Sequence, residues 1–258
     1  MKLRFLGTGT SFGVPVIGCD CDVCASDDPR DRRTRHAAVV EHEGGRLLVD
    51  APPELRLQLI DAGIARLDAV WFTHCHADHI HGIDDLRAVS VRRTDPLRVL
   101  AGPGCAEILR QRFEYIFDDG YWPPPGTSKP RLRLEVMDGT RDIDAAGLTL
   151  RPVAAQHGPI TVFGFRVGGL GYVTDAKTFL PGALDALRGC RVLVLNALWF
   201  GNPHPTHLNV EEAVELAAEL GAERTFITHL THRVSHAELE ARLPPGVEPA
   251  YDGLVVDV

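Results

Sequence analysis

The segment THCHADHIHG, residues 73–82, places four side chains that commonly bind metals within six positions: His74, His76, Asp78 and His79. Alternate residues of an extended segment face the same side, so His74 and His76 can share one metal ion. A turn or the start of a helix would let Asp78 and His79 face a second ion. Neutral imidazoles and a carboxylate suit zinc, manganese or iron. This spacing predicts a metal centre, and four solvated loop side chains are the less economical alternative.

Three further ligand-type residues close short apolar runs elsewhere in the chain. His157 ends RPVAAQH, Asp175 ends GYVTD and His229 ends RTFITH. Each run is typical of a buried strand, and chemistry at strand ends is the norm in α/β proteins. Singly, each residue is more simply a capping or hydrogen-bonded group. Together with residues 73–82, the three favour a centre that binds two metal ions.

A cysteine cluster, GCDCDVC, forms a second constellation, with thiols at Cys19, Cys21 and Cys24. Three thiolates at this spacing can wrap one tetrahedral zinc ion and leave a fourth position open. His232 is the natural fourth ligand, and His36 or simply three reduced thiols in a loop are the alternatives. A closed site of this kind would be structural and would staple the long loop at about residues 8–35. The isolated Cys75, Cys105 and Cys190 are most simply reduced residues in or near the core.

The elements that must position these residues follow from hydrophobic patterning. A first strand is predicted at residues 2–7, and two apolar runs around Gly44-Gly45 predict a hairpin. The run DAVWFTH predicts a buried strand that delivers the histidine cluster. Further strands are expected at 97–101, 131–136, 148–155, 161–167, 170–174, 191–196 and 223–227, with helices near 54–62, 103–113, 209–219 and 235–241 and an exposed loop at 117–130. No repeat or composition break divides the chain, so we expect one domain spanning residues 1–258.

Composition bounds the class of protein. The chain has 258 residues, 45% of them hydrophobic, and a formal charge of −8. That is ordinary for a soluble globular protein. No apolar stretch approaches the roughly 18 residues that a membrane span needs, so we expect a cytoplasmic protein without membrane contact. Net acidity argues against nucleic acid as a partner.

The chain resembles the metallo-β-lactamase superfamily over nearly its full length. The resemblance lies in the order of its motifs: HxHxDH, then a lone His, a lone Asp and a final His. The resemblance implies an α/β protein with an αββα sandwich, in which two mixed sheets are flanked by helices. It implies two divalent ions in the active site, manganese or zinc with iron as a further option. One ion would take His74, His76 and His157, and the other Asp78, His79 and His229. Asp175 would bridge them, and Asp50 in LLVDA would orient the ligands from behind.

Other motifs are similar to those of the PhnP family, which opens phosphoribosyl 1,2-cyclic phosphate. They are TGTSFGVP at residues 8–15, the cysteine loop, THLTH at 228–232 and YDG at 251–253. The resemblance implies a phosphodiesterase acting on a small cyclic diester through an activated water, with one structural zinc and a homodimeric state. His207 would be the general acid that protonates the leaving oxygen, alongside Asp78 in the catalytic set, and His204 on the same loop is its rival.

Several alternatives stay open on the sequence. Arg87 is a speculative phosphate contact, for which a surface ion pair is the simpler explanation. The glycine-rich GTGTSFG resembles a phosphate loop, but no βαβ unit follows it, so tight turning near the metal site is preferred. Ribonuclease Z-like processing of tRNA 3′ ends is a second possible activity, disfavoured by the net charge and by the lack of a tRNA-grasping segment. Hydrolysis of a thioester or lactam is a third.

Overall fold

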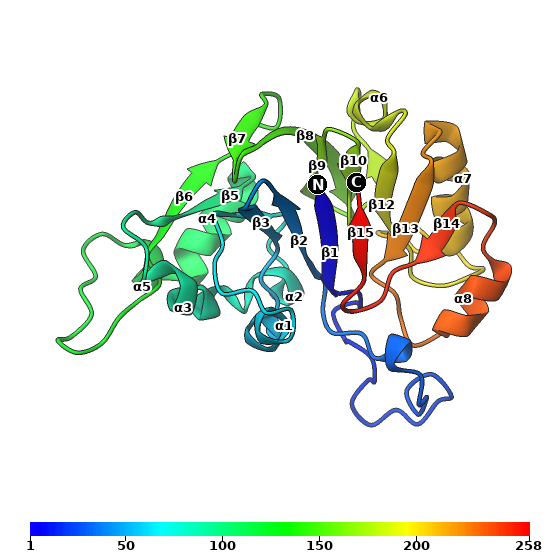
Figure 1. The fold of residues 1–258 in the computed structure, drawn as a ribbon, viewed down its shortest axis with the longest axis horizontal. Coiled ribbons are helices and arrows are strands. Elements are labelled where there is room, and N and C mark those ends of the chain that lie inside the picture. Colours follow the sequence, from blue (N-terminus) through cyan, green and yellow to red (C-terminus); the bar gives the residue numbers. More distant parts are fainter.

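The computed structural model describes residues 1–258 and shows two mixed β-sheets packed face to face, with helices on their outer sides (Figure 1). The predicted αββα sandwich is confirmed. The first sheet has the order β15-β1-β2-β3-β4-β5-β6. Its strands are β1 (Lys2–Gly7), β2 (Ala37–His42), β3 (Gly45–Val49), β4 (Ala69–Phe72), β5 (Leu97–Ala101), β6 (Leu132–Val136) and β15 (Val255–Asp257).

The second sheet has the order β11-β8-β9-β10-β12-β13-β14, with β7 paired to β8. Its strands are β7 (Ile143–Ala145), β8 (Leu148–His157), β9 (Ile160–Val167), β10 (Leu170–Tyr172), β11 (Thr178–Phe179), β12 (Val192–Asn196), β13 (Arg224–Thr228) and β14 (Val247–Pro249). The strands β10, β12, β13 and β14 run parallel to one another. Their carboxyl ends therefore meet at one edge, where polar groups can gather.

Helices cover both sheets on the outside. The first sheet carries α1 (Leu55–Asp61), α2 (Ala77–Ile80), α3 (Arg87–Ser90), α4 (Pro103–Arg112), α5 (Glu114–Phe117) and the 3₁₀ helix η2 (Ile83–Leu86). The second carries α6 (Ala183–Leu187), α7 (Val210–Leu220) and α8 (His236–Arg242). Helix α7 begins at a capping box in which Asn209 and Glu212 satisfy each other's backbone amides. Its glutamate-rich first turn agrees with the helix predicted near 209–219, and the helix ends one residue later than predicted, at Leu220.

The hydrophobic core forms three layers because side chains alternate along each strand. Trp71 of β4 points between the sheets, while its neighbours Val70 and Phe72 point outward under the helices. Trp71 meets Phe165 of the second sheet edge to face, with ring centroids 5.3 Å apart. Full burial of one such side chain stabilises the fold by about 1.5–3 kcal/mol. The two sheets are thus held together by a continuous apolar layer.

The hairpin between β2 and β3 differs by one residue from the prediction. The two turn residues are Glu43 and Gly44, with φ angles of 48° and 83°, and Gly45 already pairs with His42 as part of β3. Positive φ at both central residues is what a tight hairpin turn requires. Gly45 is needed for another reason: a Cβ atom there would lie 2.2 Å from the carbonyl oxygen of Ala146.

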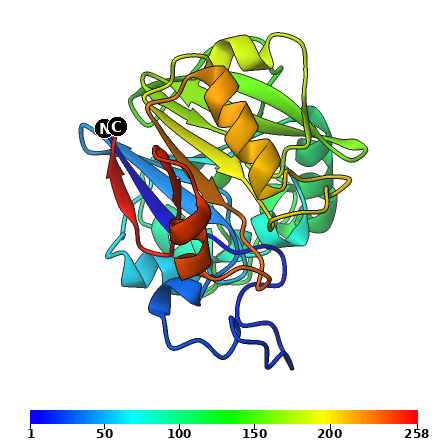
Figure 2. The same ribbon diagram turned by 90° about the vertical axis from the view of Figure 1, so that its right-hand side faces the viewer.

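The long loop at residues 8–35 lies beneath β1 and β15 and includes the 3₁₀ helix η1 (Pro29–Asp31) (Figures 1 and 2). The Asp252 carboxylate ties both of its ends, accepting hydrogen bonds from the amide and hydroxyl of Thr8 and of Thr34 at 2.6–2.8 Å. Burial raises the pKa of Asp252 to about 6, although these four hydrogen bonds act to lower it. The two chain ends lie side by side because β1 pairs with β15. None of the helices has the length and apolar character that crossing a membrane would demand.

Candidate metal centre

Seven ligand-type side chains predicted from the sequence converge where strands of both sheets end. His74 and His76 follow β4, and Asp78 and His79 lie on the short helix α2. The other three come from the second sheet: His157 is the last residue of β8, Asp175 follows β10 and His229 follows β13. Six of the seven are buried, and His76 is exposed. The fold therefore brings together residues separated by up to 155 positions.

Two groups of three side chains face each other within this centre. The ligand atoms of His74, His76 and His157 lie within 4.8 Å of one another, and so do those of Asp78, His79 and His229. These are the two sets that the family pattern implied. His74 Nε2 and His76 Nδ1 are 3.1 Å apart, close enough to meet at a single ion.

Asp175 lies close to both groups. Its Oδ2 is 3.5 Å from His79 Nε2 and its Oδ1 is 3.1 Å from His229 Nε2, both in the second group. A carboxylate oxygen of Asp175 also lies within 4.8 Å of the ligand atoms of His74 and of His157, in the first group. Burial acts to raise the pKa of Asp175, but His229, His79, His207 and His74 outweigh it and hold the pKa well below its usual value. The carboxylate is thus ionised and available to cations on both sides.

The far side of several imidazole rings is fixed by hydrogen bonds. His79 Nδ1 donates to Asp50 Oδ2 at 2.7 Å, and His157 Nδ1 donates to the carbonyl oxygen of Thr206 at 2.9 Å. His74 Nδ1 lies 3.1 Å from the hydroxyl of Thr73, which itself donates to Asp50. Such contacts leave Nε2 as the free lone pair and aim it into the centre. The sequence indicated Asp50, but it gave no sign of the Thr206 carbonyl.

Three residues of the centre adopt left-handed backbone conformations. Asp50, Asp175 and His229 have φ angles of 61°, 56° and 60°. A residue other than glycine is uncommon there, and such strain clusters at functional sites. The chain turns sharply at the end of each strand, which directs the three side chains into one space. No local sequence pattern announced this feature.

Several buried nitrogen atoms of the donor set have no hydrogen-bond partner in the protein. His79 Nε2 and both ring nitrogens of His229 are buried and make no hydrogen bond. Buried polar atoms normally have a partner, so these nitrogens lack one that the protein does not supply. Facing carboxylates and neutral imidazole nitrogens are the donors that divalent zinc, manganese or iron prefer. The residues therefore fit a divalent metal centre.

His207 lies against this centre and His204 lies one ring further out. The His207 ring is 4.4 Å from that of His157 and stacks on His229 at 4.9 Å, with Nδ1 3.6 Å from Asp175 Oδ1. Burial lowers the pKa of His207 to about 3, a shift that Asp175 opposes and that neighbouring histidines reinforce. The His204 ring contacts His207 at 5.2 Å. Of the two histidines, His207 is nearer to the ligand atoms.

The cysteine cluster lies beside the centre and includes His232. His232 Nδ1 is 3.3, 3.5 and 3.6 Å from the sulfur atoms of Cys19, Cys21 and Cys24. The four ligand atoms lie within 4.8 Å of one another, as a tetrahedral site requires.

The alternative that His36 completes the cysteine cluster is wrong. His36 is fully buried beneath the metal centre, where its Nε2 forms a hydrogen bond of 2.7 Å with the Tyr172 hydroxyl. The sequence did not indicate that His36 lies near His79 and His229, whose ring centroids are 5.7 and 6.2 Å from its own. His36 directly precedes β2, which pairs with β1.

Two weaker sequence hypotheses are also resolved. Arg87 forms an ion pair with Asp84 on the surface, so the simpler explanation holds and its charge is already neutralised. Gly9 of the glycine-rich segment packs tightly, because a Cβ atom there would lie 2.6 Å from the carbonyl oxygen of Arg33. Gly9 therefore serves close backbone packing, a different role from the tight turning that the sequence favoured for this segment.

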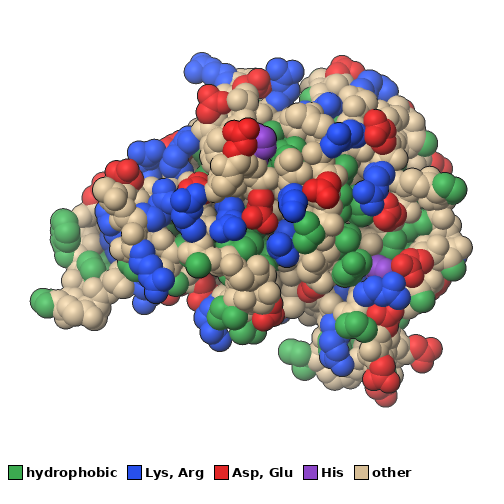
Figure 3. Space-filling model, viewed as in Figure 1, with side chains coloured by type: hydrophobic (Ala, Val, Ile, Leu, Met, Phe, Trp, Pro, Cys, Tyr) green, Lys and Arg blue, Asp and Glu red, His purple; other side chains and the backbone are tan.

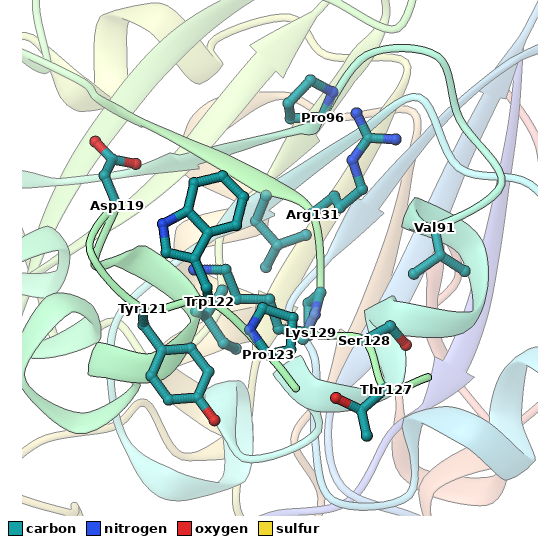
Figure 4. A pocket seen from close by; sticks show the side chains of 13 residues that line it. Val91, Pro96, Asp119, Tyr121, Trp122, Pro123, Thr127, Ser128, Lys129 and Arg131 are labelled. Atoms are coloured by element: carbon teal, nitrogen blue, oxygen red, sulfur yellow. The ribbon is translucent and has the colours of Figure 1, made fainter. Parts of the chain in front are cut away.

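A separate pocket of about 580 Å³ lies beside β6, between the loop at 117–130 and the segments around Val91 and Pro96 (Figure 4). Trp122, which is 83% exposed, stands over it. None of the seven ligand-type residues lines this pocket.

On the face viewed in Figure 3, acidic and basic side chains are interspersed. That pattern differs from the continuous basic surface of a typical nucleic-acid binder.

Comparison with known proteins gives a consistent family. A family model described as a β-lactamase superfamily domain matches residues 45–230. A solved diphosphatase from the PhnP family is 35% identical, with a TM-score of 0.91, and the match covers 100% of this chain and 97% of that one. Ribonuclease Z from a Mycobacterium species is 31% identical over 231 residues, which cover 78% of this chain and 79% of the relative.

A curated relative from Porphyromonas gingivalis is named octanoyltransferase. It is 37% identical over 256 residues, and the match covers 98% of this chain. The chain spans about half the length of that relative, 51%.

Proposed function

The chain belongs to the β-lactamase superfamily and, within it, to the PhnP family, and on this premise we propose that it is a metal-dependent phosphodiesterase. Its substrate in this proposal is a small cyclic phosphate diester such as phosphoribosyl 1,2-cyclic phosphate. One observation carries the proposal: a carboxylate oxygen of Asp175 lies within 4.8 Å of ligand atoms from both groups of donors, His74 and His157 in one and His79 in the other. The similarity to a diphosphatase of the PhnP family directs the choice toward phosphate chemistry.

In this proposal, His74, His76 and His157 hold one divalent ion, and Asp78, His79 and His229 hold the other, with Asp175 shared. Such ions supply Lewis acidity toward a phosphate and make a water molecule a better nucleophile at neutral pH. Asp50 and the Thr206 carbonyl keep the rings oriented through the hydrogen bonds described above.

The reaction is hydrolysis of one phosphorus–oxygen bond. The oxygen of a water molecule bonds to phosphorus and releases one proton to the solvent, the bond to the leaving sugar oxygen breaks, and the product is a phosphate monoester. His207 donates the proton that the leaving oxygen requires. In the protein without substrate, burial lowers the pKa of His207 to about 3, and the negative charge of a bound phosphate would oppose that shift as Asp175 does.

The cysteine loop has a structural role in the same proposal. Cys19, Cys21, Cys24 and His232 hold one zinc ion, and all four positions of the tetrahedron come from the chain. His232 is three residues after His229. A zinc ion at this point would fix the loop at 8–35 and the segment that carries a ligand of the active centre.

A ribonuclease Z-type endonuclease is a second candidate, favoured by the 31% identity to the Mycobacterium enzyme. The formal charge of −8 and the interspersed charges of Figure 3 weigh against it, because tRNA binding depends on neutralising many phosphates. The assay therefore includes a precursor tRNA.

Elemental analysis combined with turnover assays tests the proposal. The substrates are bis-(p-nitrophenyl) phosphate, ribose 1,2-cyclic phosphate with and without a 5-phosphate, and precursor tRNA. We expect about three metal ions per chain and cleavage of the cyclic diesters. In Asp78→Ala, the metal content of the active centre and the turnover should both fall. Asp85→Ala is the matched control, since Asp85 lies on η2 outside the centre. Cleavage of tRNA alone would replace the proposal by the second candidate. Full metal loading without any phosphodiester cleavage would reject both and direct the search to thioesters and lactams.

A further inference from the structure

An arginine stacked on a tryptophan lies next to the proposed active site. The guanidinium carbon of Arg233 is 4.4 Å from the ring centroid of Trp199. The indole is fixed because its Nε1 donates to the carbonyl oxygen of Asn202 at 2.9 Å. Its other neighbour is His204, whose ring meets it edge to face at 5.5 Å. His204 in turn contacts His207, so the Trp199–Arg233 pair continues the row of rings that begins at the metal centre.

The charge of Arg233 is not neutralised by the protein. Its side chain is exposed, makes no ion pair and donates no hydrogen bond. Lys177, the other cation that acts with Arg233 on His204, is instead bound by both oxygens of Glu212 at 2.6 and 2.8 Å. Burial is the main cause of the lowered pKa of His204, and His157, Lys177 and Arg233 add to it. Arg233 is therefore the unpaired positive charge close to this histidine.

The contact with the indole leaves the N–H groups of Arg233 free. Its guanidinium carbon lies over the ring of Trp199, and none of its five N–H groups donates to a protein acceptor. The guanidinium fork matches two oxygens of a phosphate group, and the contact with Trp199 keeps it beside the site before any ligand arrives. A second stacked arginine nearby lacks this property, because Arg242 lies 3.5 Å over Phe200 but is paired with Glu238.

We propose that Arg233, held by Trp199, is a specificity-determining residue that binds a second phosphate group of the substrate. The inference rests on the proposed phosphodiesterase function and adds to it the residue that recognises a second phosphate of the substrate, such as the one that phosphoribosyl 1,2-cyclic phosphate carries on its sugar. That group is either a phosphate on a sugar hydroxyl or the neighbouring phosphate of a diphosphate linkage. Both offer the same tetrahedral anion to the guanidinium.

Paired substrates that differ by one phosphate test the inference. The first pair is ribose 1,2-cyclic phosphate with and without a 5-phosphate, and the second is a diphosphate diester with the corresponding monophosphate diester. We expect the native protein to prefer the member with the extra phosphate in one pair. Because hydrogen bonds to a charged group are worth about 1.5–3 kcal/mol, the ratio of the two kcat/KM values should fall about tenfold to a hundredfold in Arg233→Ala. The loss should appear mainly in KM, and Arg233→Lys should restore part of it.

Arg242→Ala is the matched control, since it removes a stacked arginine from the same region without an unpaired charge, and the ratio should stay unchanged. An undiminished preference in Arg233→Ala, or no preference in the native protein for either pair, would overturn the inference. The pair that responds identifies the source of the second phosphate.

Equilibrium binding separates this inference from the proposed function. If no diester is cleaved, the function fails, and calorimetric titration with ribose 1,5-bisphosphate and ribose 1-phosphate still tests Arg233. We expect the bisphosphate to bind about tenfold more tightly to the native protein, with the difference lost in Arg233→Ala. Equal binding of the two compounds by the native protein would contradict the assignment.

Discussion

Replacing Asp50 by asparagine tests whether a residue that touches no metal controls the metal centre. The Asp50 carboxylate is fully buried and accepts hydrogen bonds from the amide and hydroxyl of Thr73 and from His79 Nδ1, the last at 2.7 Å. Asparagine has nearly the same shape, but one of its two acceptor oxygens becomes an NH₂ donor. If the remaining oxygen keeps the Thr73 amide, the new donor faces His79 Nδ1.

The consequence falls on the tautomer of His79. Its Nδ1 would have to become an acceptor, which moves the proton to Nε2, the nitrogen that faces Asp175. A protonated Nε2 cannot bind a metal ion. Loss of such a partner typically costs about 10–100-fold in metal affinity, or about 1.4–2.7 kcal/mol. The protein should stay folded, because the carboxamide still fills the space.

The assay is a competition titration of metal-depleted protein with a chelator of known affinity, run for zinc and for manganese. We expect the affinity of one of the two active-centre ions to fall by that factor in Asp50→Asn while the cysteine site is unaffected. Asp84→Asn is the control, because the Asp84 carboxylate pairs with Arg87 and Tyr115 outside the centre. If Asp50→Asn binds both ions as tightly as the native protein, the orientation argument is refuted.

His207→Asn should lower kcat about 10²–10⁴-fold on a sugar cyclic phosphate, because the leaving alkoxide needs a proton. The loss should be far smaller on bis-(p-nitrophenyl) phosphate, whose leaving phenol is acidic. Equal losses on both substrates would contradict the role of His207 as general acid. Cys21→Ser should lose about one zinc ion per chain and melt at a lower temperature, so an unchanged melting curve would argue against a structural zinc. Burial raises the pKa of Asp252 from 3.8 to about 6, so the folded state takes up a proton that the unfolded state releases. This stabilisation is complete below about pH 4 and is lost as the pH rises through 6. Between pH 4 and 7 the free energy of unfolding of the metal-free native protein should therefore fall by up to ~3 kcal/mol relative to that of Asp252→Asn. Denaturant titrations that show the same pH dependence for both proteins would contradict this.

Many ligands of the centre could be predicted from the sequence because they lie where the apolar runs typical of strands end. The apolar run before His74 and the one before His229 each predicted a strand. The structure has both: β4 ends at Phe72, two residues before His74, and β13 ends at Thr228, directly before His229. Alternation within an extended segment placed His74 and His76 on one side. Those inferences need only neighbouring residues and the two-residue period of a strand.

Short elements were beyond this reach. The helix α2 has four residues and β11 has two, too few for a hydrophobic period to repeat. The hairpin turn at Glu43 was misplaced by one residue, since what requires glycine at position 45 is the carbonyl oxygen of Ala146, a hundred residues away in sequence.

The sequence by itself determined which donors are present, how they are spaced and that most of them end strands. Only the tertiary structure decided that His36 supports the centre instead of the cysteine cluster, that Arg87 is neutralised by Asp84, and that Arg233 is stacked but unpaired. It also decided that Asp175 lies close to both groups of donors. The reason is physical: periodicity reports which face a side chain takes on its own strand or helix, whereas a pairing depends on packing between chain segments that no local pattern encodes.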